Sequence, residues 1–450
     1  MRALRALSSL LLLAACDGSS NPGVRIELVD PSGDNAALDV IEGSLAVQVR
    51  QGDTSLCTEG CSTVISGGDF ELTLPIESFV DLTRLQGHII GGPVETWGAV
   101  PPFAIAGEFL ETAELPVRLV MMAPGTCEPL TLFNVSTAGR PRLVEPRRDM
   151  AVAIRRNFAL LAGGRGDAGG SNRADFFDQI VVEMRPPLDS PSGPLGPSRG
   201  LTLSEDASLV VGETTWVYER QVQGPPAPAQ VTVHEGAGFA SALALVNNTA
   251  AVIGGTDTDQ VSWFTARTPF PATTLTTPRA FPAAAAGAEG VLVVGGGPGA
   301  EWITITGAPV FIDGVPDSVG GWVTASPSGQ TFLAIGGSGA VTTIFRGCPA
   351  CVAEPGPEWT RARDGASAVR TEAGVLWIVG GDDSALVDLV RWEGEMPMVS
   401  PGPDLSQPRA GAAVAEHASG VVFVVGGENA EGMLAEAELC TPAEGLDPLN

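Results

Sequence analysis

The chain has 450 residues, 44% of them apolar, so it is long enough for two or three domains or one large repeat domain and is not intrinsically disordered. Its 25 basic residues, all arginines, face 52 acidic residues; the formal net charge of -27 repels phosphate backbones and argues against nucleic acid as a partner. The 57 glycines and 36 prolines, with few helical patterns, predict short strands joined by many turns.

The N-terminus predicts export. Residues 1–15 combine Arg2 and Arg5 with a short apolar stretch, which is typical of a secretory signal peptide. The stretch ends in Leu-Ala-Ala-Cys at Cys16, which resembles the lipobox of bacterial lipoproteins. The resemblance implies that Cys16 is acylated and anchors the protein at the cell envelope, in the inner or outer membrane, by its lipid only. Residues 16–23 then form a tether; a plain signal peptide is the alternative.

Residues 24–127 have partial period-two alternation, interrupted by turn residues. This pattern predicts a small β-sandwich domain, with an immunoglobulin-like fold as the closest type. The expected strands are VRIELVD, GSLAVQVRQ, DFELTLPI, LTRLQGHIIGG, FAIAGEF and LPVRLVMM.

Six further cysteines remain, an even number in a chain expected to be exported. They are Cys57 and Cys61 in CTEGC, Cys348 and Cys351 in CPAC, and the separate Cys127 and Cys440. A zinc site is the competing interpretation, but no histidine lies near either close pair. The CPAC spacing also resembles a thiol oxidoreductase, yet its surroundings indicate strand, turn and strand rather than a helix N-terminus. Disulfides are therefore predicted.

An internal repeat ends on a pair of glycines. The pairs end at Gly164, Gly255, Gly296, Gly337, Gly381 and Gly427, and recur every 41 to 46 residues after Gly255. The longer interval before Gly255 holds a degenerate unit, SLVVGE at Ser208–Glu213. Seven units result.

Each unit has further common features. An arginine followed by small residues precedes the glycines, at Arg148, Arg199, Arg279, Arg363 and Arg409; GFASALA near Gly238 and GWVTAS near Gly321 hold the equivalent places. A β-rich segment follows the glycines: DQIVVEM, TTWVYE, QVSWFTA, EWITI, AVTTIF, LVDLVRWE and AEAELC.

These units resemble the kelch repeat. The resemblance implies an all-β fold in which residues 128–450 form a seven-bladed kelch-like β-propeller, with four strands in each blade. The kelch tyrosine and tryptophan are mostly missing, because Tyr218 is the one tyrosine. Six or eight blades are the alternatives, the diglycine of HIIGGPVETWGAV being the candidate for an eighth.

Closure of the ring requires one more strand, because the last unit ends soon after AEAELC. PLTLFNV at Pro129–Val135 is the expected fourth strand of this blade. Antiparallel pairing would bring Cys440 beside Cys127, which predicts a disulfide at the seam.

Several motifs suggest chemistry. VLVVGGGPGA at Val291–Ala300 resembles a dinucleotide-binding turn, but a β pattern follows it where a helix is required. The acidic pairs Asp257 with Asp259 and Asp382 with Asp383 follow diglycines and are candidate calcium ligands, or else solvated turns. Copper chemistry of the tyrosine-dependent kind seen in some kelch-like oxidases does not suit a chain with one tyrosine.

The sequence thus favours a non-enzymatic, monomeric cell-envelope lipoprotein whose propeller is a scaffold for binding a protein or glycan. No catalytic residue, metal ligand or cofactor is assigned. The alternative is an extracellular polysaccharide hydrolase or lyase with carboxylates at the propeller axis. A calcium-stabilised structural protein is the third hypothesis.

Overall fold

The computed structural model describes residues 23–29, 31, 42–51, 54–55, 62–66, 71–75, 83–90, 96–103, 117–132, 141–155, 158–179, 182–189, 195–204, 206–219, 227–265, 268–315, 321–336, 341–359, 364–382, 384–418 and 420–444. Within these ranges the regular secondary structure consists of strands. No described segment forms a helix that is long and apolar enough to cross a membrane.

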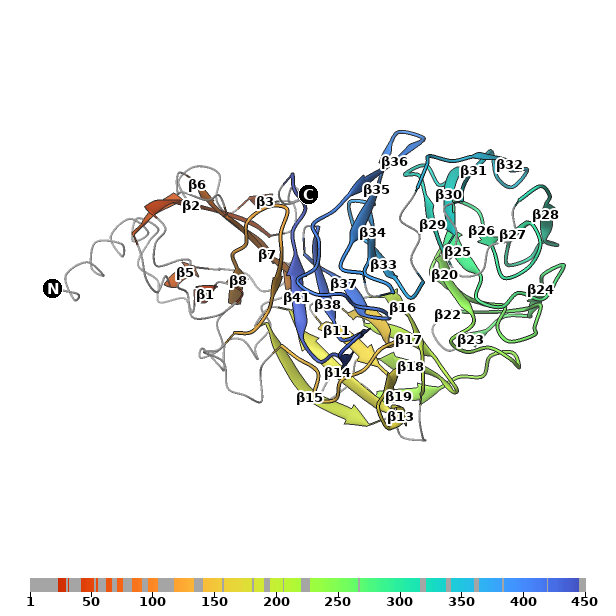
Figure 1. The fold of residues 1–450 in the computed structure, drawn as a ribbon, viewed down its shortest axis with the longest axis horizontal. Coiled ribbons are helices and arrows are strands. Elements are labelled where there is room, and N and C mark those ends of the chain that lie inside the picture. Colours follow the sequence, from red (N-terminus) through yellow and green to blue (C-terminus); the bar gives the residue numbers. More distant parts are fainter. Residues whose placement is uncertain are drawn as a thin grey trace.

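Seven antiparallel sheets form the blades of a β-propeller, which confirms the predicted number (Figure 1). Blade 1 comprises β10 (Ala151–Arg155), β11 (Phe158–Ala162), β14 (Arg173–Asp178) and β15 (Glu183–Asp189). Blade 2 comprises β16 (Arg199–Ser204), β17 (Ala207–Val211), β18 (Thr215–Glu219) and β19 (Ala227–Gln230). Blade 3 comprises β20 (Ala242–Val246), β21 (Thr249–Ile253), β22 (Gln260–Thr265), β23 (Thr268–Pro269) and β24 (Thr273–Thr274).

The remaining blades continue in chain order around the ring, from green to blue in Figure 1. Blade 4 comprises β25 (Ala283–Ala286), β26 (Val291–Val294), β27 (Ala300–Ile303) and β28 (Val310–Ile312). Blade 5 comprises β29 (Gly321–Ala325), β30 (Thr331–Gly336), β31 (Thr342–Arg346) and β32 (Val352–Pro355). Blade 6 comprises β33 (Ser367–Arg370), β34 (Leu376–Val379), β35 (Val387–Glu393) and β36 (Met396–Pro401). Blade 7 comprises β37 (Ala413–Ala418), β38 (Val421–Val425), β41 (Ala437–Cys440) and β9 (Cys127–Pro129).

Apolar packing between neighbouring blades explains the pattern of the second strand in each unit. β26, with the sequence VLVV, is buried along its whole length. Val291 and Val293 face a cluster shared with blade 3, whereas Leu292 and Val294 face a cluster shared with blade 5. A strand covered on both faces needs a continuous apolar run, and this is why the repeat lacks period-two alternation at this point.

The N-terminal strands form two further sheets, at the left of Figure 1. One consists of β5 (Glu71–Pro75), β1 (Gly23–Val29) and β8 (Val117–Val120); the other of β3 (Thr54–Ser55), β2 (Glu42–Gln51), β4 (Ser62–Ser66), β6 (Thr83–Ile90) and β7 (Thr96–Phe103). Because β6, which precedes the diglycine of HIIGGPVETWGAV, pairs with β2 and β7, this segment is not an eighth blade. The immunoglobulin-like type of the region stays a prediction.

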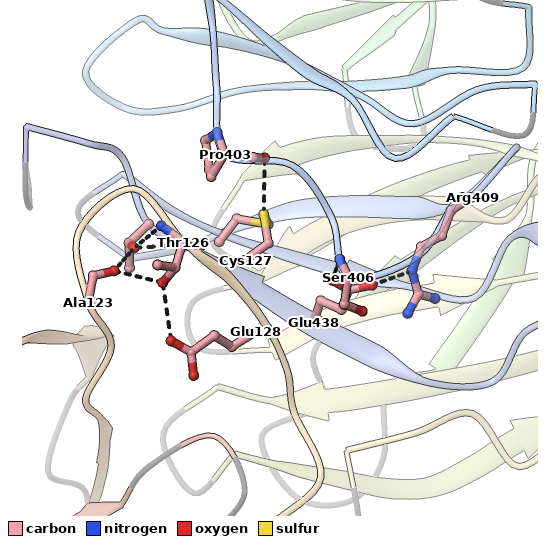
Figure 2. The surroundings of a disulfide bond; sticks show 10 residues. Ala123, Thr126, Cys127, Glu128, Pro403, Ser406, Arg409 and Glu438 are labelled. Carbon is pink, nitrogen blue, oxygen red and sulfur yellow. Dashed lines mark hydrogen bonds and ion pairs between the residues drawn. A yellow bond between two sulfur atoms is a disulfide. The ribbon is translucent and has the colours of Figure 1, made fainter. Parts of the chain in front are cut away.

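Blade 7 is closed by a strand from before the first blade, as predicted. In β9 and β41, Cys127 lies directly opposite Cys440, and a disulfide with an S–S distance of 2.03 Å joins them (Figure 2). The predicted location of the strand, Pro129–Val135, was wrong, because β9 ends at Pro129. Leu132 has a left-handed backbone (φ 39°), and the Thr131 and Leu132 amides donate to the Pro31 carbonyl instead of to the blade.

The third strand of blade 1 also differs from the prediction. DQIVVEM was expected, but β14 has the sequence RADFFD, and Glu183 and Met184 begin the fourth strand. Two apolar stretches, Phe176–Phe177 and residues 180–182, flank Asp178 and Gln179, so the apolar pattern does not fix which of them lies in the third strand. The register in the structure is the one that places Asp175 beside the buried Arg147.

Candidate functional site

One face of the propeller carries both the diglycine turns and the loops that enter each blade; we call it the diglycine face. Strands alternate in direction, so these two kinds of connection lie at the same end of every blade. Gly380, in blade 6, shows why glycine is required there: its φ is 65°, and a Cβ would lie 2.1 Å from the Arg409 carbonyl oxygen.

Three buried arginines organise this face. Each makes an ion pair with an acid in the third strand of its own blade: Arg147 with Asp175, Arg279 with Glu301 at 2.9 Å, and Arg409 with Glu438 at 2.9 Å. All six side chains have no exposed surface. Each acid occupies the same register position, opposite the residue that stands two before the first glycine.

The same arginines join neighbouring blades. The Arg409 guanidinium donates to the carbonyl of Gly426 in its own blade at 2.8 Å, while its backbone carbonyl accepts from the amide of Gly381 in blade 6 at 2.7 Å. Figure 2 shows Glu438 between Arg409 and Ser406. The Glu438 carboxylate accepts hydrogen bonds from the Arg409 guanidinium and from the Ser406 amide. These arginines are therefore enclosed by protein and hold the scaffold together.

The prediction of the arginine position was correct in blades 4 and 7 and wrong by one residue in blade 1. Arg147 is the buried residue there, whereas the predicted Arg148 is partly exposed and pairs with Glu428. Arg199 in blade 2 is exposed, and Arg363 lies outside the described residues.

In blade 3, His234 takes the place of the arginine, and sequence analysis missed it. Its Nε2 lies 2.8 Å from the Gly254 carbonyl oxygen, so this nitrogen carries the proton, and Nδ1 lies 2.9 Å from the Ser262 hydroxyl. Ser262 stands where other blades have the acid. Burial lowers the pKa of His234, and the bond to Gly254 opposes that shift.

A second set of residues on the diglycine face lies two positions after these arginines. Here Asp149 (φ 55°), Phe281 (φ 54°) and Gly411 (φ 63°) have left-handed backbone, and so does Gly365 (φ 68°) at the equivalent position of blade 6. Their amides link successive blades: Gly411 donates to Gly365, and Asp149 donates to Gly411. Asp149 and Phe281 thus carry side chains in a backbone conformation that costs non-glycine residues about 1–2 kcal/mol. Such strain is found most often at functional sites.

Asp149 lies within a group of charged side chains, which we call the arginine cluster: Arg148, Arg165 and Arg199 with Asp149 and Glu428. The Asp149 Oδ2 is 3.4 Å from Arg148 Nε and 3.5 Å from Arg165 Nη2, and 17% of its side chain is exposed. Burial raises the pKa of Asp149, while the three arginines, Arg148 foremost, act to lower it.

An aromatic pair adjoins the cluster. The Arg199 guanidinium lies 4.6 Å above the ring centroid of Phe239, and its Nε donates to the Phe239 carbonyl at 3.2 Å. The Phe281 ring meets the Phe239 ring edge-on at 6.0 Å and is 40% exposed. Charged and apolar surface therefore lie side by side across blades 1 to 4.

The other residues singled out in the sequence do not join this group. Cys348 and Cys351 form a disulfide in the turn between β31 and β32, at the opposite end of blade 5. Strand β27, not a helix, follows the glycines of VLVVGGGPGA. Asp257 and Asp382 are exposed in their turns, and the described residues contain no group of three or more histidine, cysteine or acidic side chains able to hold a metal. Cys16, Cys57, Cys61 and Asp383 lie outside the described residues.

Comparison with known proteins gives the fold. No family model matches the chain, and no curated protein matches it. Among solved structures, a copper-bound fungal alcohol oxidase of the AA5 family is 16% identical over 70% of this chain and 79% of its own, with a TM-score of 0.52. A streptogramin B lyase is 9% identical over 66% and 95%, with a TM-score of 0.50, and YjhT is 12% identical over 67% and 96%, with a TM-score of 0.43. At these identities the likeness to the oxidase and the lyase shows a common propeller fold and no common activity.

Proposed function

We propose that the protein is a cell-envelope binding protein with kelch-like repeats, anchored through Cys16, whose diglycine face holds a protein or glycan ligand. The observation that carries the proposal is the arginine cluster with its aromatic neighbours. Three exposed or partly exposed arginines gather on one face of a chain whose net charge is -27, around a strained aspartate. Backbone strain at the centre of such a cluster is typical of a face that has a ligand.

The anchor and the face can be tested separately. Palmitate labelling in a bacterial host should mark the wild-type chain and not the Cys16→Ser variant, which should leave the membrane fraction. Equal labelling of both chains would contradict the lipoprotein proposal and leave the binding face untouched.

Capture from envelope extract tests the binding face. The wild type and an Arg148→Gln/Arg165→Gln variant should be compared, with Arg346→Gln as the control because Arg346 makes an exposed ion pair with Glu354 elsewhere on the molecule. We expect the double variant alone to lose the captured protein or glycan. Identical capture by all three chains would show that this face is not the binding site.

An enzyme acting on envelope polysaccharide is the second candidate, and the partly buried Asp149, with its raised pKa, favours it as a proton donor. Appearance of new sugar ends on incubation with polysaccharide, lost in Asp149→Asn, would replace the binding proposal with this one. Copper chemistry of the oxidase kind fits poorly, because Tyr218 is 1% exposed and packed between blades 1 and 2.

A further inference from the structure

From the arginine cluster and the aromatic pair we infer that the diglycine face binds the carboxylate of an acidic sugar, with Asp149 as an internal competitor for the same arginines. The inference rests on the proposed function and names the chemical class of its ligand.

The charges of the cluster favour a carboxylate. Its three arginines are faced by two acids, Asp149 and Glu428, so the cluster has an excess of one positive charge. Arg165 and Arg148 both reach the same Oδ2 atom of Asp149 at ion-pair distances of 3.4–3.5 Å, longer than a close charge-assisted hydrogen bond. A ligand carboxylate can therefore replace Asp149 as their partner without breaking a short hydrogen bond.

The excess charge also bears on the type of ligand. A dense polyanion would be repelled by the chain's net charge of -27, whereas a single carboxylate meets mainly the local arginines. Arg165 projects from the short hairpin β12 (Arg165–Gly166) and β13 (Gly169–Gly170), and its side chain is 45% exposed. A ligand can therefore reach it more easily than Arg148, whose side chain is 29% exposed.

The aromatic pair provides the second half of the site. The guanidinium of Arg199 covers one face of Phe239, which leaves the 40% exposed Phe281 as the accessible apolar surface. An acidic sugar combines a carboxylate with an apolar ring face, and Phe281, which adjoins Arg199 through Phe239, supplies the apolar half of such a site. An acidic peptide offers the carboxylate without such a ring face, and for this reason the sugar is favoured.

Substitutions of Asp149 test the inference, because they should increase the affinity of the arginines for the ligand. At the equivalent position blades 6 and 7 have Gly365 and Gly411, so Asp149→Gly fits the backbone. Asparagine also adopts left-handed backbone readily. Both substitutions remove the internal competitor while the arginines remain, and two variants guard against a local folding defect in either one.

Titration calorimetry with the full chain should use three probes: D-glucuronate, D-glucose and acetate. We expect glucuronate to bind more tightly than either of the others, since only it offers both ring and carboxylate. Asp149→Asn and Asp149→Gly should tighten glucuronate binding by about threefold to tenfold, and Arg165→Gln should weaken it about tenfold, the effect of losing one charge-assisted contact. Arg346→Gln should change nothing.

Lowering the pH from 7.5 to 5 should tighten glucuronate binding by the wild type. Protonation of Asp149, the group whose pKa burial raises, frees Arg148, Arg165 and Arg199, with Glu428 as the other acid facing them. The Asp149→Asn variant should show no such dependence.

Each outcome has one meaning. Equal binding of glucuronate, glucose and acetate, or unchanged affinity in the Asp149 variants, would overturn the inference. If the capture experiment succeeds while glucuronate does not bind, the face binds another ligand, and the proposed function stands without this inference. If acetate binds as tightly as glucuronate and glucose does not bind, the ring contributes nothing to affinity, and the acidic sugar is excluded as the ligand.

Discussion

Among single residues, His234 links the stability of the propeller to pH. It is neutral in the fold because Nε2 donates to Gly254 and Nδ1 accepts from Ser262, and burial keeps its pKa below the ordinary value of about 6.5. As the pH falls, the unfolded chain therefore takes up this proton first. The stabilisation is complete above about pH 6.5 and is lost from there downward until the folded-state pKa is reached.

The His234→Gln variant isolates this effect. Between pH 7 and pH 5.5, we expect the unfolding free energy of the wild type to fall relative to that of the variant. The difference, measured by urea denaturation, should be up to about 1.4 kcal/mol per pH unit. If the unfolding free energies of the two proteins change equally with pH, His234 has the same pKa in the folded and the unfolded state. Changes in overall charge repulsion affect both proteins and cancel in the comparison.

Phe281 separates stability from function. Its left-handed backbone costs about 1–2 kcal/mol, which glycine would relieve. Against this gain, the glycine variant loses the burial of a ring that is 40% exposed and has a more flexible unfolded chain. Phe281→Gly should therefore leave the unfolding free energy within about 1 kcal/mol of the wild type. Calorimetry with glucuronate should nevertheless show about tenfold weaker binding, as expected for loss of an aromatic contact. A large loss of stability would mean that Phe281 is a packing residue.

Within the structural elements, the buried arginines act through the shape of the guanidinium. Arg279 donates to the carbonyls of Gly295, Gly297, Pro298 and Gly299 as well as to Glu301. A lysine keeps the charge but cannot donate in so many directions, and buried carbonyls would lose their partners.

Arg279→Lys should therefore lower the unfolding free energy by about 2–4 kcal/mol in urea denaturation. Arg346→Lys is the matched control, because its ion pair with Glu354 at 3.2 Å is exposed and its loss should cost under about 1 kcal/mol. Similar losses in the two variants would show that charge, not shape, is what the buried site requires.

The seven repeat units could be predicted because the turn after the second strand of a blade requires glycine for its backbone geometry, as at Gly380. The register of the buried arginine could not be predicted in blade 1, since Arg147 and Arg148 are adjacent and only one points inward. The acid in the third strand was an unused signal: Asp175, Glu301, Asp388 and Glu438 occur in the units that have an arginine at the turn. The units with Ser262 or Thr343 at that register lack an arginine in the equivalent place, and in blade 2, where Trp216 stands there, Arg199 is exposed.

The arginine cluster was beyond sequence analysis for a different reason. Arg148, Arg165 and Arg199 come from an entry loop, a hairpin and the first strand of the next blade, and Glu428 comes from the far end of the chain. Only the closed ring brings them together. The closing strand β9 has three residues and pairs through its backbone, so no apolar pattern marks it.

For the whole molecule, the Cys127–Cys440 disulfide fixes this closure, joining residues 313 apart. Cross-links that close long loops restrict the unfolded chain most, so Cys127→Ala/Cys440→Ala should lower the unfolding free energy by about 2–5 kcal/mol. Cys348→Ala/Cys351→Ala, whose bridge spans a separation of 3, should cost clearly less. Equal midpoints for the two variants in urea would show that the seam is held by packing alone.

The seam also determines when, during synthesis, the propeller can close. A ribosome delivers Cys127 313 residues before Cys440, so the first edge of the ring stays without its partner until β41 has been made. Blades 1 to 6 are each built from one contiguous stretch, but blade 7 needs both ends of the propeller. A chain interrupted before β41 leaves two open edges, so the bridge forms only after the third strand of blade 7 has been made.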